Sequence, residues 1–375
     1  METSPDVLII GGGLAGLTSA IHLSQKGLKV VLIEKSDYPR HKVCGEYISN
    51  EILPYLQWLG VEVSKLNPTN ITKFEFTTIN GKAATAKLPL GGFGISRYAL
   101  DNFLYQKALT NNCSIIKETV TNVSLSNDIF TVTLPDQILS AKIILGAFGK
   151  RSNIDQVLDR DFINKKSPWL AVKAHYSGTL DNDLVALHNF NGGYCGVSKV
   201  ENNIINICYL ADYSTFKQYK NIEDYQQNVL YKNKHLKSVF ENSSLLFDKP
   251  ITISQISFDK KQPVENHILM IGDTAGLIHP LCGNGMAMAI HSAKIASELI
   301  LDYYSNKEMS RELLERKYTE EWNTHFGKRI YMGRILAQIL THKTITNILV
   351  GIVAAFPGIL RRIIKQTHGK PIAIN

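Results

Sequence analysis

Apolar and amphipathic stretches alternate near the start of the chain. Residues 7–10 are uniformly apolar, as in a parallel strand buried on both faces of a sheet. Residues 14–26 repeat apolar side chains at helical spacing, and Gly27 ends that helix. Residues 29–34 form a second apolar run. The pattern predicts a β-α-β unit.

The next hundred residues combine short strands with one helix. Residues 98–111 are predicted to be helical because their apolar side chains form one side. The sequence Ser126-Asn127-Asp128 predicts a hairpin between two neighbouring strands. The other expected elements are strands at residues 74–78, 119–125, 130–134 and 142–146 and a turn at residues 91–94.

Residues 167–260 alternate apolar and polar positions with a period of two, which predicts an antiparallel sheet with one buried face. A helix is expected within this region at residues 222–232. A buried strand at residues 267–271 and a long helix at residues 286–302 come next. From residue 308 the chain is predicted to be helical almost to its end.

The amino-acid composition says little about the fold beyond its being globular, but it narrows the classes of binding partner. Apolar residues make up 44% and charged residues 20% of the 375 residues, which is typical of a folded globular protein. The net charge of +8 favours anionic partners, such as a dinucleotide, a phospholipid surface or an acidic substrate. Zinc-finger spacing and an arginine-rich arm are absent from the sequence, so neither nucleic acid nor a metal site is expected.

The cysteines and the N-terminus favour a cytoplasmic protein. The five cysteines are widely spaced and include no C-x-x-C pair, so a disulfide framework is not expected. The first residues lack the basic segment and small-residue cleavage site of a signal peptide. The first apolar run is interrupted by glycines and is too short to span a bilayer.

The first motif that carries chemistry is a G-x-G-x-x-G sequence between the first strand and the first helix. Gly11 makes the tight turn, Gly13 lets the backbone approach a pyrophosphate, and Gly16 permits close helix–strand packing. Leu14 and Ala15 open the helix, whose free N–H groups and partial positive charge favour phosphates. The alternative, an ordinary tight turn, is weakened by the acidic residue that follows the second strand.

That acidic residue is Glu34, whose carboxylate is placed to accept hydrogen bonds from ribose hydroxyls. Its charge repels a 2′-phosphate, so the motif favours a dinucleotide without one. Lys35 is expected to lie beside the same end of the cofactor. Together these residues predict a dinucleotide site at the start of the chain.

Two later motifs are predicted to complete a site for FAD. An apolar strand runs into a Gly-Asp pair, whose carboxylate is suited to hold the ribityl hydroxyls. A Cys-Gly-Asn-Gly sequence then lets the backbone approach a planar ring, and the positive end of the next helix stabilises reduced flavin. A turn aspartate and an ordinary loop are the respective alternatives. The contacts predicted here are Asp273, Gly283, Asn284, Gly285 and Met286.

A fourth motif, residues 39–47, follows shortly after Glu34 and is expected to run along the cofactor. Arg40 and Lys42 are suited to neutralise the pyrophosphate. Cys44 and Glu46 are placed to reach the flavin ring. A solvated basic loop with a buried cysteine is the alternative.

In this order and spacing, the motifs resemble the geranylgeranyl-reductase-like branch of FAD-dependent oxidoreductases, which share a fold with aromatic hydroxylases and flavin halogenases. The resemblance covers roughly residues 6 to 300. It implies that Arg97, at the start of a helix with Leu-Asp, lies near the flavin, and that Val120 belongs to the cofactor site. The matching sequences are Lys42-Val43-Cys44-Gly45-Glu46, Arg97-Tyr98-Ala99-Leu100-Asp101, Gly272-Asp273, and Pro280 with Gly283 and Gly285.

The sequence departs from two relatives of that branch. Phe148 stands where aromatic hydroxylases carry the aspartate of an Asp-Gly pair, which argues against NAD(P)H use in the hydroxylase manner. The Trp-x-Trp-x-Ile-Pro signature of tryptophan halogenases is absent, so halogenation is not expected.

The expected fold is α/β, with a glutathione-reductase-like, Rossmann-type FAD-binding domain, an antiparallel-sheet substrate domain and a helical C-terminus. The FAD-binding domain is expected to combine residues 1–165 and 262–305, with residues 47–92 contributing to the substrate domain. The substrate domain itself is expected at residues 166–261, and the helical region at residues 306–375.

The resemblance implies an FAD-dependent oxidoreductase that acts on a lipid-like, polyprenyl or polyketide-type substrate. Its FAD is expected to be reduced by NAD(P)H or a ferredoxin-like donor, and then to reduce a C=C bond. Monooxygenation is one alternative, and a non-catalytic prenyl- or lipid-binding escort protein is another. The predicted catalytic residues are Cys44, Glu46 and Cys282, with Cys44 or Glu46 as the proton donor.

Residues 343–370 differ from the rest of the chain. Residues 345–360 are almost wholly apolar, are broken at Pro357-Gly358 and are followed by basic residues. An apolar helix with a basic end is suited to lie in a bilayer interface. The alternative is a helix that covers the substrate domain. The protein is therefore expected in the cytoplasm, with peripheral membrane contact through this segment as an open alternative.

Overall fold

The computed structural model describes residues 4–374, so residues 1–3 and 375 of the expected domains lie outside the described part. A six-stranded sheet forms one half of the molecule, and its strands are parallel except at one edge. The strands, in spatial order, are β17 (Val264–Glu265), β18 (Ile268–Met270), β10 (Ile143–Gly146), β1 (Val7–Ile10), β2 (Val30–Ile33) and β6 (Ser114–Ile116). The predicted β-α-β unit is confirmed: it consists of β1, α1 (Leu14–Gln25) and β2, and its two strands lie inside this sheet.

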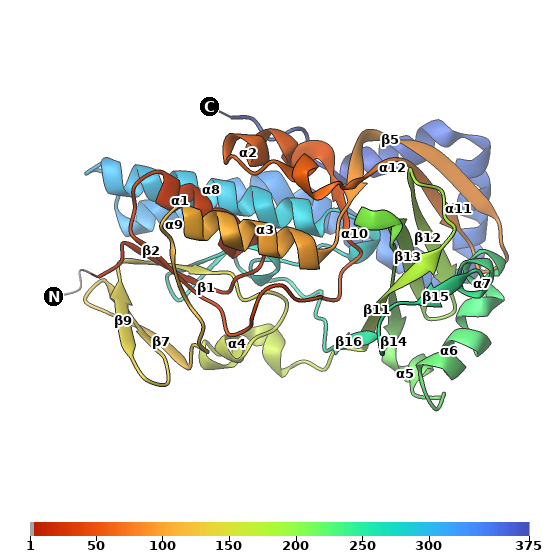
Figure 1. Cartoon of the computed structure of the whole chain (residues 1–375), viewed down its shortest axis with the longest axis horizontal. Helices are drawn as coiled ribbons and strands as arrows, with labels where there is room; N and C mark the ends of the chain where they lie inside the picture. Colours follow the sequence, from red (N-terminus) through yellow and green to blue (C-terminus); the bar gives the residue numbers. More distant parts are fainter. Residues whose placement is uncertain (1–3, 375) are drawn as a thin grey trace.

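Helices cover one face of this sheet and a small sheet lies toward the other (Figure 1). The helices are α1 (Leu14–Gln25), α3 (Arg97–Thr110) and α8 (Gly285–Ser305), and the small sheet comprises β7 (Asn122–Ser126), β8 (Ile129–Thr133) and β9 (Ile138–Ala141). The predicted hairpin joins β7 to β8. Asn127 and Asp128 both adopt positive φ, 48° and 61°, as a tight hairpin turn requires.

A nine-stranded sheet forms the other half. Its pairings are antiparallel except between β12 and β4, so the predicted antiparallel sheet contains one parallel step. The order is β15 (Ser243–Leu245), β11 (Trp169–Gly178), β14 (Ile205–Asp212), β13 (Gly193–Lys199), β12 (Leu184–Phe190), β4 (Thr69–Thr77), β5 (Ala83–Gly94) and β3 (Tyr47–Ser49), and β16 (Ile251–Ser254) also pairs with β11.

The turn predicted at residues 91–94 is wrong, because these glycines end strand β5 and pair with β3 and β4. Their small size serves close packing. A Cβ at Gly92 would lie 2.4 Å from the Tyr47 ring, and one at Gly94 would lie 1.8 Å from the carbonyl oxygen of Lys199. Glycine here therefore marks close approach within a sheet.

Short helices cover one face of the nine-stranded sheet, and apolar side chains of the helices and the sheet form a buried hydrophobic cluster there. They are α5 (Tyr213–Phe216), α6 (Ile222–Asn228) and α7 (Lys234–Glu241). The helix predicted at residues 222–232 ends early, at Asn228, and a 3₁₀ turn at Leu230–Lys232 leads into α7. Asn233 caps α7 by accepting the N–H of His235 at 3.0 Å, which fixes the break between the helices.

The C-terminal part is helical, as predicted, but it is divided into α9 (Arg311–Trp322), α10 (Lys328–Thr341), α11 (Lys343–Ala355) and α12 (Pro357–Thr367). Pro357 separates the last two, because proline is accommodated in the first turn of a helix rather than in its interior. Both α11 and α12 pack on β5 and lie far from α1 in the molecule (Figure 1).

Within residues 4–374, no single helix is long and apolar enough to cross a membrane. One pair, Arg311–Thr341 with Thr344–Ala355, reaches the required length and composition together, but it bends by 114°.

Candidate functional site

A cavity of about 1030 Å³ lies between the two sheets and continues beneath the C-terminal helices. The glycine turn after β1 and Asp273 after β18 both line it, although more than 250 residues separate them in the chain. They meet because β1, β10 and β18 are parallel neighbours whose carboxyl ends share one edge of the sheet. Ligands of open α/β sheets bind at this edge.

The glycine turn forms a cradle that only glycine can build. Gly11 has φ +108°, and a Cβ there would lie 2.4 Å from the carbonyl oxygen of Ala147. A Cβ at Gly16 would lie 2.0 Å from the carbonyl oxygen of Gly11. Gly13 precedes α1, and no side chain among residues 4–374 caps that helix. The first N–H groups of Leu14 and Ala15 therefore remain available to a phosphate at the positive end of the helix.

Glu34 lies at the tip of β2 and lines the cavity. Its carboxylate accepts N–H bonds from Gly12 at 2.8 Å and Ser36 at 3.0 Å. Arg40 pairs with it at 2.9 Å, and the Nε atom of Arg40 is buried without a hydrogen-bond partner in the described part of the chain. Exposed Lys35 lines the same end. This end thus offers an oriented carboxylate and an unsatisfied donor, which fit an adenosine ribose and a phosphate.

Two cations converge on Asp101 beside the glycine turn. Arg97 binds this carboxylate through two N–H groups at 2.6 and 2.8 Å, and Lys42 binds it at 2.8 Å. Burial alone would raise the pKa of Asp101, but the Arg97 and Lys42 charges lower it below the ordinary value. Arg97 also lies close to Gly13, with 3.9 Å between its Nη2 atom and a Cβ built there. One net positive charge thus faces the predicted pyrophosphate position.

Asp273 belongs to a 3₁₀ turn, Gly272–Thr274, that is hydrogen-bonded to the segment after β10, where Phe148 departs from the hydroxylase motif. Lys261 donates to the carbonyl oxygens of Lys150 at 2.9 Å and Asp273 at 3.0 Å. Burial lowers the pKa of Lys261 to about 8. Gly149 donates its N–H to Thr274 at 2.8 Å. Sequence reasoning missed Lys261, because a lone lysine in a polar stretch carries no motif.

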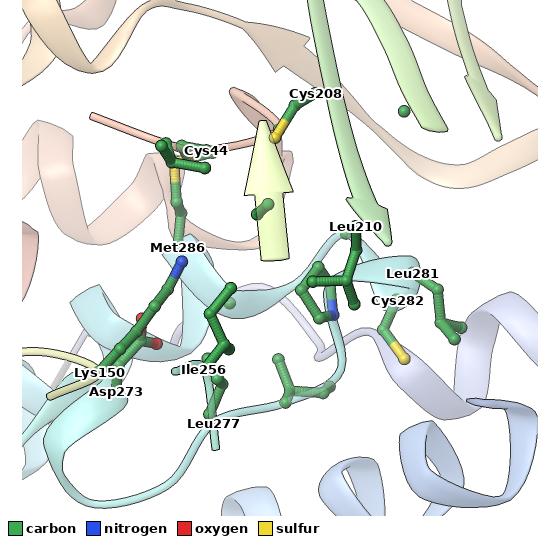
Figure 2. A pocket seen from close by; sticks show the side chains of 18 of the residues that line it. Cys44, Lys150, Cys208, Leu210, Ile256, Asp273, Leu277, Leu281, Cys282 and Met286 are labelled. Atoms are coloured by element: carbon green, nitrogen blue, oxygen red, sulfur yellow. The ribbon is translucent and has the colours of Figure 1, made fainter. Parts of the chain in front are cut away.

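The cavity places Cys44 at the junction of the two halves of the molecule. Its Sγ atom lies 3.5 Å from Sδ of Met286, and its carbonyl oxygen accepts an N–H bond from Asn206 of β14 at 3.2 Å. Figure 2 shows Met286 between Cys44 and the side chains of Lys150 and Asp273. The half-buried thiol of Cys44 therefore faces the space where the ring end of FAD is expected.

Glu46 occupies a fully buried ionic cluster beneath this loop. Lys173 and the main-chain N–H of Arg97 each donate to its Oε1 at 2.8 Å, and Nε2 of His175 lies 2.7 Å from its Oε2. Burial would raise the pKa of Glu46, but His175 and Lys173 lower it below the ordinary value. Glu46 is thus held as a carboxylate, which counts against the prediction that it donates a proton.

Sequence reasoning missed Lys173 and His175. They lie two residues apart on β11, so their side chains share one face of an otherwise apolar strand. Two ionisable side chains on the buried face of a strand were the available signal, because such groups persist there only with a partner.

Most of the remaining predicted residues line the cavity, and Asn284 is the exception. Val120, Gly283, Gly285, Met286 and Cys282 line the cavity. Burial raises the pKa of Cys282 to about 12, so this thiol stays protonated, and Figure 2 places it away from Cys44.

The predicted contact of Asn284 with the cofactor stays a prediction, but the side chain of Asn284 is already bound to other residues. Its amide is fully buried and donates to Glu51 at 3.0 Å, while its Oδ1 accepts from Arg329 at 3.2 Å. Glu51 also accepts the N–H of Gly369 at 2.7 Å. Asn284 therefore helps to anchor the C-terminus, and it turns away from the cavity because this buried carboxylate needs donors.

The far half of the cavity is apolar. Side chains of β4, β5 and β12 form one wall, and the C-terminal helices form the other. The main apolar residues are Phe74, Phe76, Leu88, Val185 and Leu187 from the sheet and Leu336, Leu340, Val350, Val353, Leu360 and Ile364 from the helices.

These features define a flavoprotein with a glutathione-reductase-like dinucleotide fold. The sequence profile of the FAD binding domain family matches residues 4–325, and the chain belongs to that family. It is an FAD-dependent oxidoreductase, and its relatives include reductases and hydroxylases.

Three curated relatives illustrate the range of the family, each 24% identical to this chain. Conditioned medium factor receptor 1 of Dictyostelium discoideum matches 90% of this chain and 71% of its own length. A digeranylgeranylglycerophospholipid reductase of Methanococcus vannielii matches 92% and 87%. The ubiquinone hydroxylase UbiM of Neisseria meningitidis matches 98% and 86%.

Solved structures share the fold at low identity. The flavin-dependent brominase Bmp2 has a TM-score of 0.79 and 17% identity, with 97% of this chain and 93% of that chain covered. A geranylgeranyl bacteriochlorophyll reductase-like protein of Thermoplasma acidophilum has a TM-score of 0.74 and 18% identity, with 97% and 96% covered. The predicted resemblance to geranylgeranyl reductases is confirmed by these matches.

Proposed function

We propose that this protein reduces C=C bonds of a long apolar substrate, of the polyprenyl or lipid-like class, with electrons supplied by bound FAD. One observation carries the proposal. The cavity that begins at the glycine turn continues without a break into an apolar chamber between β4, β5, β12 and the C-terminal helices. A chamber of this shape suits a flexible hydrocarbon chain and offers few polar groups to orient a small polar substrate.

The residues of the dinucleotide half fit FAD. Glu34 would hold the adenosine ribose, the amides at the start of α1 would hold the pyrophosphate with Arg97 and Lys42, and Asp273 would hold the ribityl chain. When bound, FAD supplies the electron-transfer chemistry, and the protein supplies binding, orientation and exclusion of water. The names of relatives that act on digeranylgeranylglycerophospholipids support a prenyl lipid as the substrate.

Cys44 is the residue proposed to hold the transferred proton, because its thiol lines the cavity where the polar and apolar halves join. We expect Cys44→Ala to keep its FAD and to lose about a hundredfold or more in turnover, the usual contribution of a positioned proton donor. Steady-state turnover and flavin absorbance would measure both properties.

Cys113→Ala is the matched control, because Cys113 is a buried thiol that does not line the cavity. It is expected to keep full turnover. If Cys44→Ala turned over at the wild-type rate, Cys44 would have no part in the reaction.

Product analysis distinguishes reduction from the alternatives. The holoenzyme would be reduced chemically and mixed with a geranylgeranylated phospholipid, first without oxygen and then with it. A product that gains two hydrogens per double bond supports the proposed reduction. A product that gains an oxygen atom only when oxygen is present would instead support a monooxygenase, which the relative named ubiquinone hydroxylase makes the second candidate.

Electron supply can be tested with the same holoenzyme. We propose a nicotinamide or a ferredoxin-like protein as the donor. Bleaching of the flavin by NADH or NADPH alone would support a nicotinamide, and bleaching only by a reduced ferredoxin would support the other donor. Tight lipid binding with neither bleaching nor product formation would support the escort alternative and overturn the proposed reaction.

A further inference from the structure

Helices α11 and α12 and the residue between them expose several large apolar side chains. We call this set the C-terminal apolar surface; it comprises Ile345, Ile348, Leu349, Ile352, Phe356 and Ile359. Ile348 is 59% exposed and Phe356 is 63% exposed, so water contacts most of both side chains. Apolar surfaces of this kind usually mark an interaction site, because leaving them in water costs free energy.

The charge of the protein is concentrated beside this surface. Glu321 is the last acidic residue of the chain, and eight lysines and arginines follow it. These eight equal the whole net charge of +8, so the preceding part of the chain is electrically balanced. Arg361, Arg362 and Lys365 are exposed on α12, and no carboxylate among residues 4–374 pairs with them.

The C-terminal apolar surface shares residues with the lining of the cavity. Leu349, Ile352 and Ile359 are part of this exposed surface and also line the cavity. The buried neighbours Val350, Val353, Leu360 and Ile364 continue the apolar lining inward. Apolar side chains of α11 and α12 therefore extend from the C-terminal apolar surface into the cavity.

We propose that the C-terminal apolar surface docks on an anionic lipid bilayer, and that the substrate enters the cavity from that bilayer between α11 and α12. The entry step rests on the apolar substrate of the proposed function, whereas the docking itself does not. Helix α11 has 13 residues, which at 1.5 Å per residue is too short to cross the roughly 30 Å hydrocarbon core. An apolar helix face bordered by cations is suited to lie in the interface, with its cations at anionic headgroups.

A second copy of the chain is a less suitable occupant. A symmetric dimer would place this surface against itself, which would bring Arg361, Arg362 and Lys365 of each copy close to the same cations of the other. Like charges at an interface repel each other, and the structure offers no acidic residue on this segment to compensate.

Co-sedimentation of the holoenzyme with vesicles tests the docking. We expect binding to phosphatidylcholine vesicles that contain phosphatidylglycerol, weaker binding to vesicles of phosphatidylcholine alone, and release by salt. Ile348→Ser combined with Phe356→Ser should lower the bound fraction about tenfold or more at fixed lipid. Neutralising Arg361, Arg362 and Lys365 to Gln should lower it by a similar factor.

Ile138→Ser is the matched control, because Ile138 is 67% exposed on β9, remote from α11 and α12 (Figure 1). It should bind vesicles like the wild type. Equal binding of the double serine variant and the control, or no wild-type binding to anionic vesicles, would overturn the proposal. So would a wild-type dimer, seen by light scattering, that the double serine variant converts to a monomer.

Each result separates the docking from the proposed reaction. Vesicle binding is measured without a substrate, so its failure leaves the reduction of C=C bonds untouched. Conversely, a protein that binds vesicles but does not reduce prenyl lipids would keep the docking and overturn the reaction. The entry step predicts that the double serine variant reduces detergent-dispersed lipid normally and loses activity only on lipid presented in vesicles.

Discussion

Gly16→Ala should yield a folded protein that has lost most of its FAD. The methyl group would lie 2.0 Å from the carbonyl oxygen of Gly11 and 3.2 Å from Cβ of Ala147. Real side chains do not approach a backbone oxygen so closely, so α1 would have to move away from the carboxyl ends of β1 and β10. Overpacking of this kind costs about 1–3 kcal/mol.

The Gly16→Ala substitution should weaken FAD binding more than it weakens the fold. The amides at the start of α1 must point at the pyrophosphate to bind it, and a displaced helix removes both the amides and its positive end from that position. We expect the flavin content of the purified variant to fall from nearly stoichiometric to a small fraction. Flavin absorbance measures this content, and far-ultraviolet circular dichroism shows whether the fold persists.

Gly327→Ala provides the matched control for this substitution. Gly327 lies in a helical turn, and a Cβ there would meet no atom within 4 Å. This variant should keep its FAD. A Gly16→Ala protein that stays fully yellow would show that the close contact of α1 with the glycine turn is not required for binding.

The dinucleotide half could be predicted because its signals are local. The apolar strand sequences, the glycine turn and Glu34 all lie within one β-α-β unit. Steric limits on the backbone are enough to explain why glycine is needed at each position of the turn. The same logic failed at residues 91–94, where glycine served close packing between strands that are distant in sequence. Spacing along the chain does not reveal such a neighbour.

The positions that bind through the backbone could be predicted from the sequence. The hydrogen-bond partners of individual side chains were harder to predict. Asn284 lies in the predicted loop, but its side-chain amide donates to the buried Glu51. Glu46 lies beside Cys44 in the expected motif, yet Lys173 and His175 on β11 set its charge. Both outcomes depend on tertiary contacts between segments more than 100 residues apart.

Glu46→Gln should destabilise the protein strongly, by about 3 kcal/mol in the free energy of unfolding. The substitution keeps the shape of the side chain and removes its charge, which leaves the ammonium group of Lys173 fully buried without a counter-ion. The loop that carries Cys44 should loosen as well, because the Glu46 side chain ties this loop to Lys173 and His175 of β11. Denaturant unfolding of the holoenzyme measures the difference.

Glu62→Gln is the control, because Glu62 forms an exposed ion pair with Lys65 at 3.0 Å. Exposed pairs contribute at most about 1 kcal/mol, so this variant should unfold almost like the wild type. If Glu46→Gln and Glu62→Gln had equal effects, the buried cluster would contribute no more than a surface pair.

The pH dependence gives an independent signature of the same cluster. The pKa of Glu46 in the folded protein lies below its ordinary value of 4.5, so below that pH the unfolded chain binds the proton more readily than the folded one. The stability that Glu46 contributes is therefore fully present above pH 4.5 and is lost as the pH falls through the folded pKa. The difference in unfolding free energy between wild type and Glu46→Gln should narrow as the pH falls through the folded pKa of Glu46. A gap that widened in acid would mean that Glu46 is protonated in the folded protein, and the carboxylate assigned to it would be wrong.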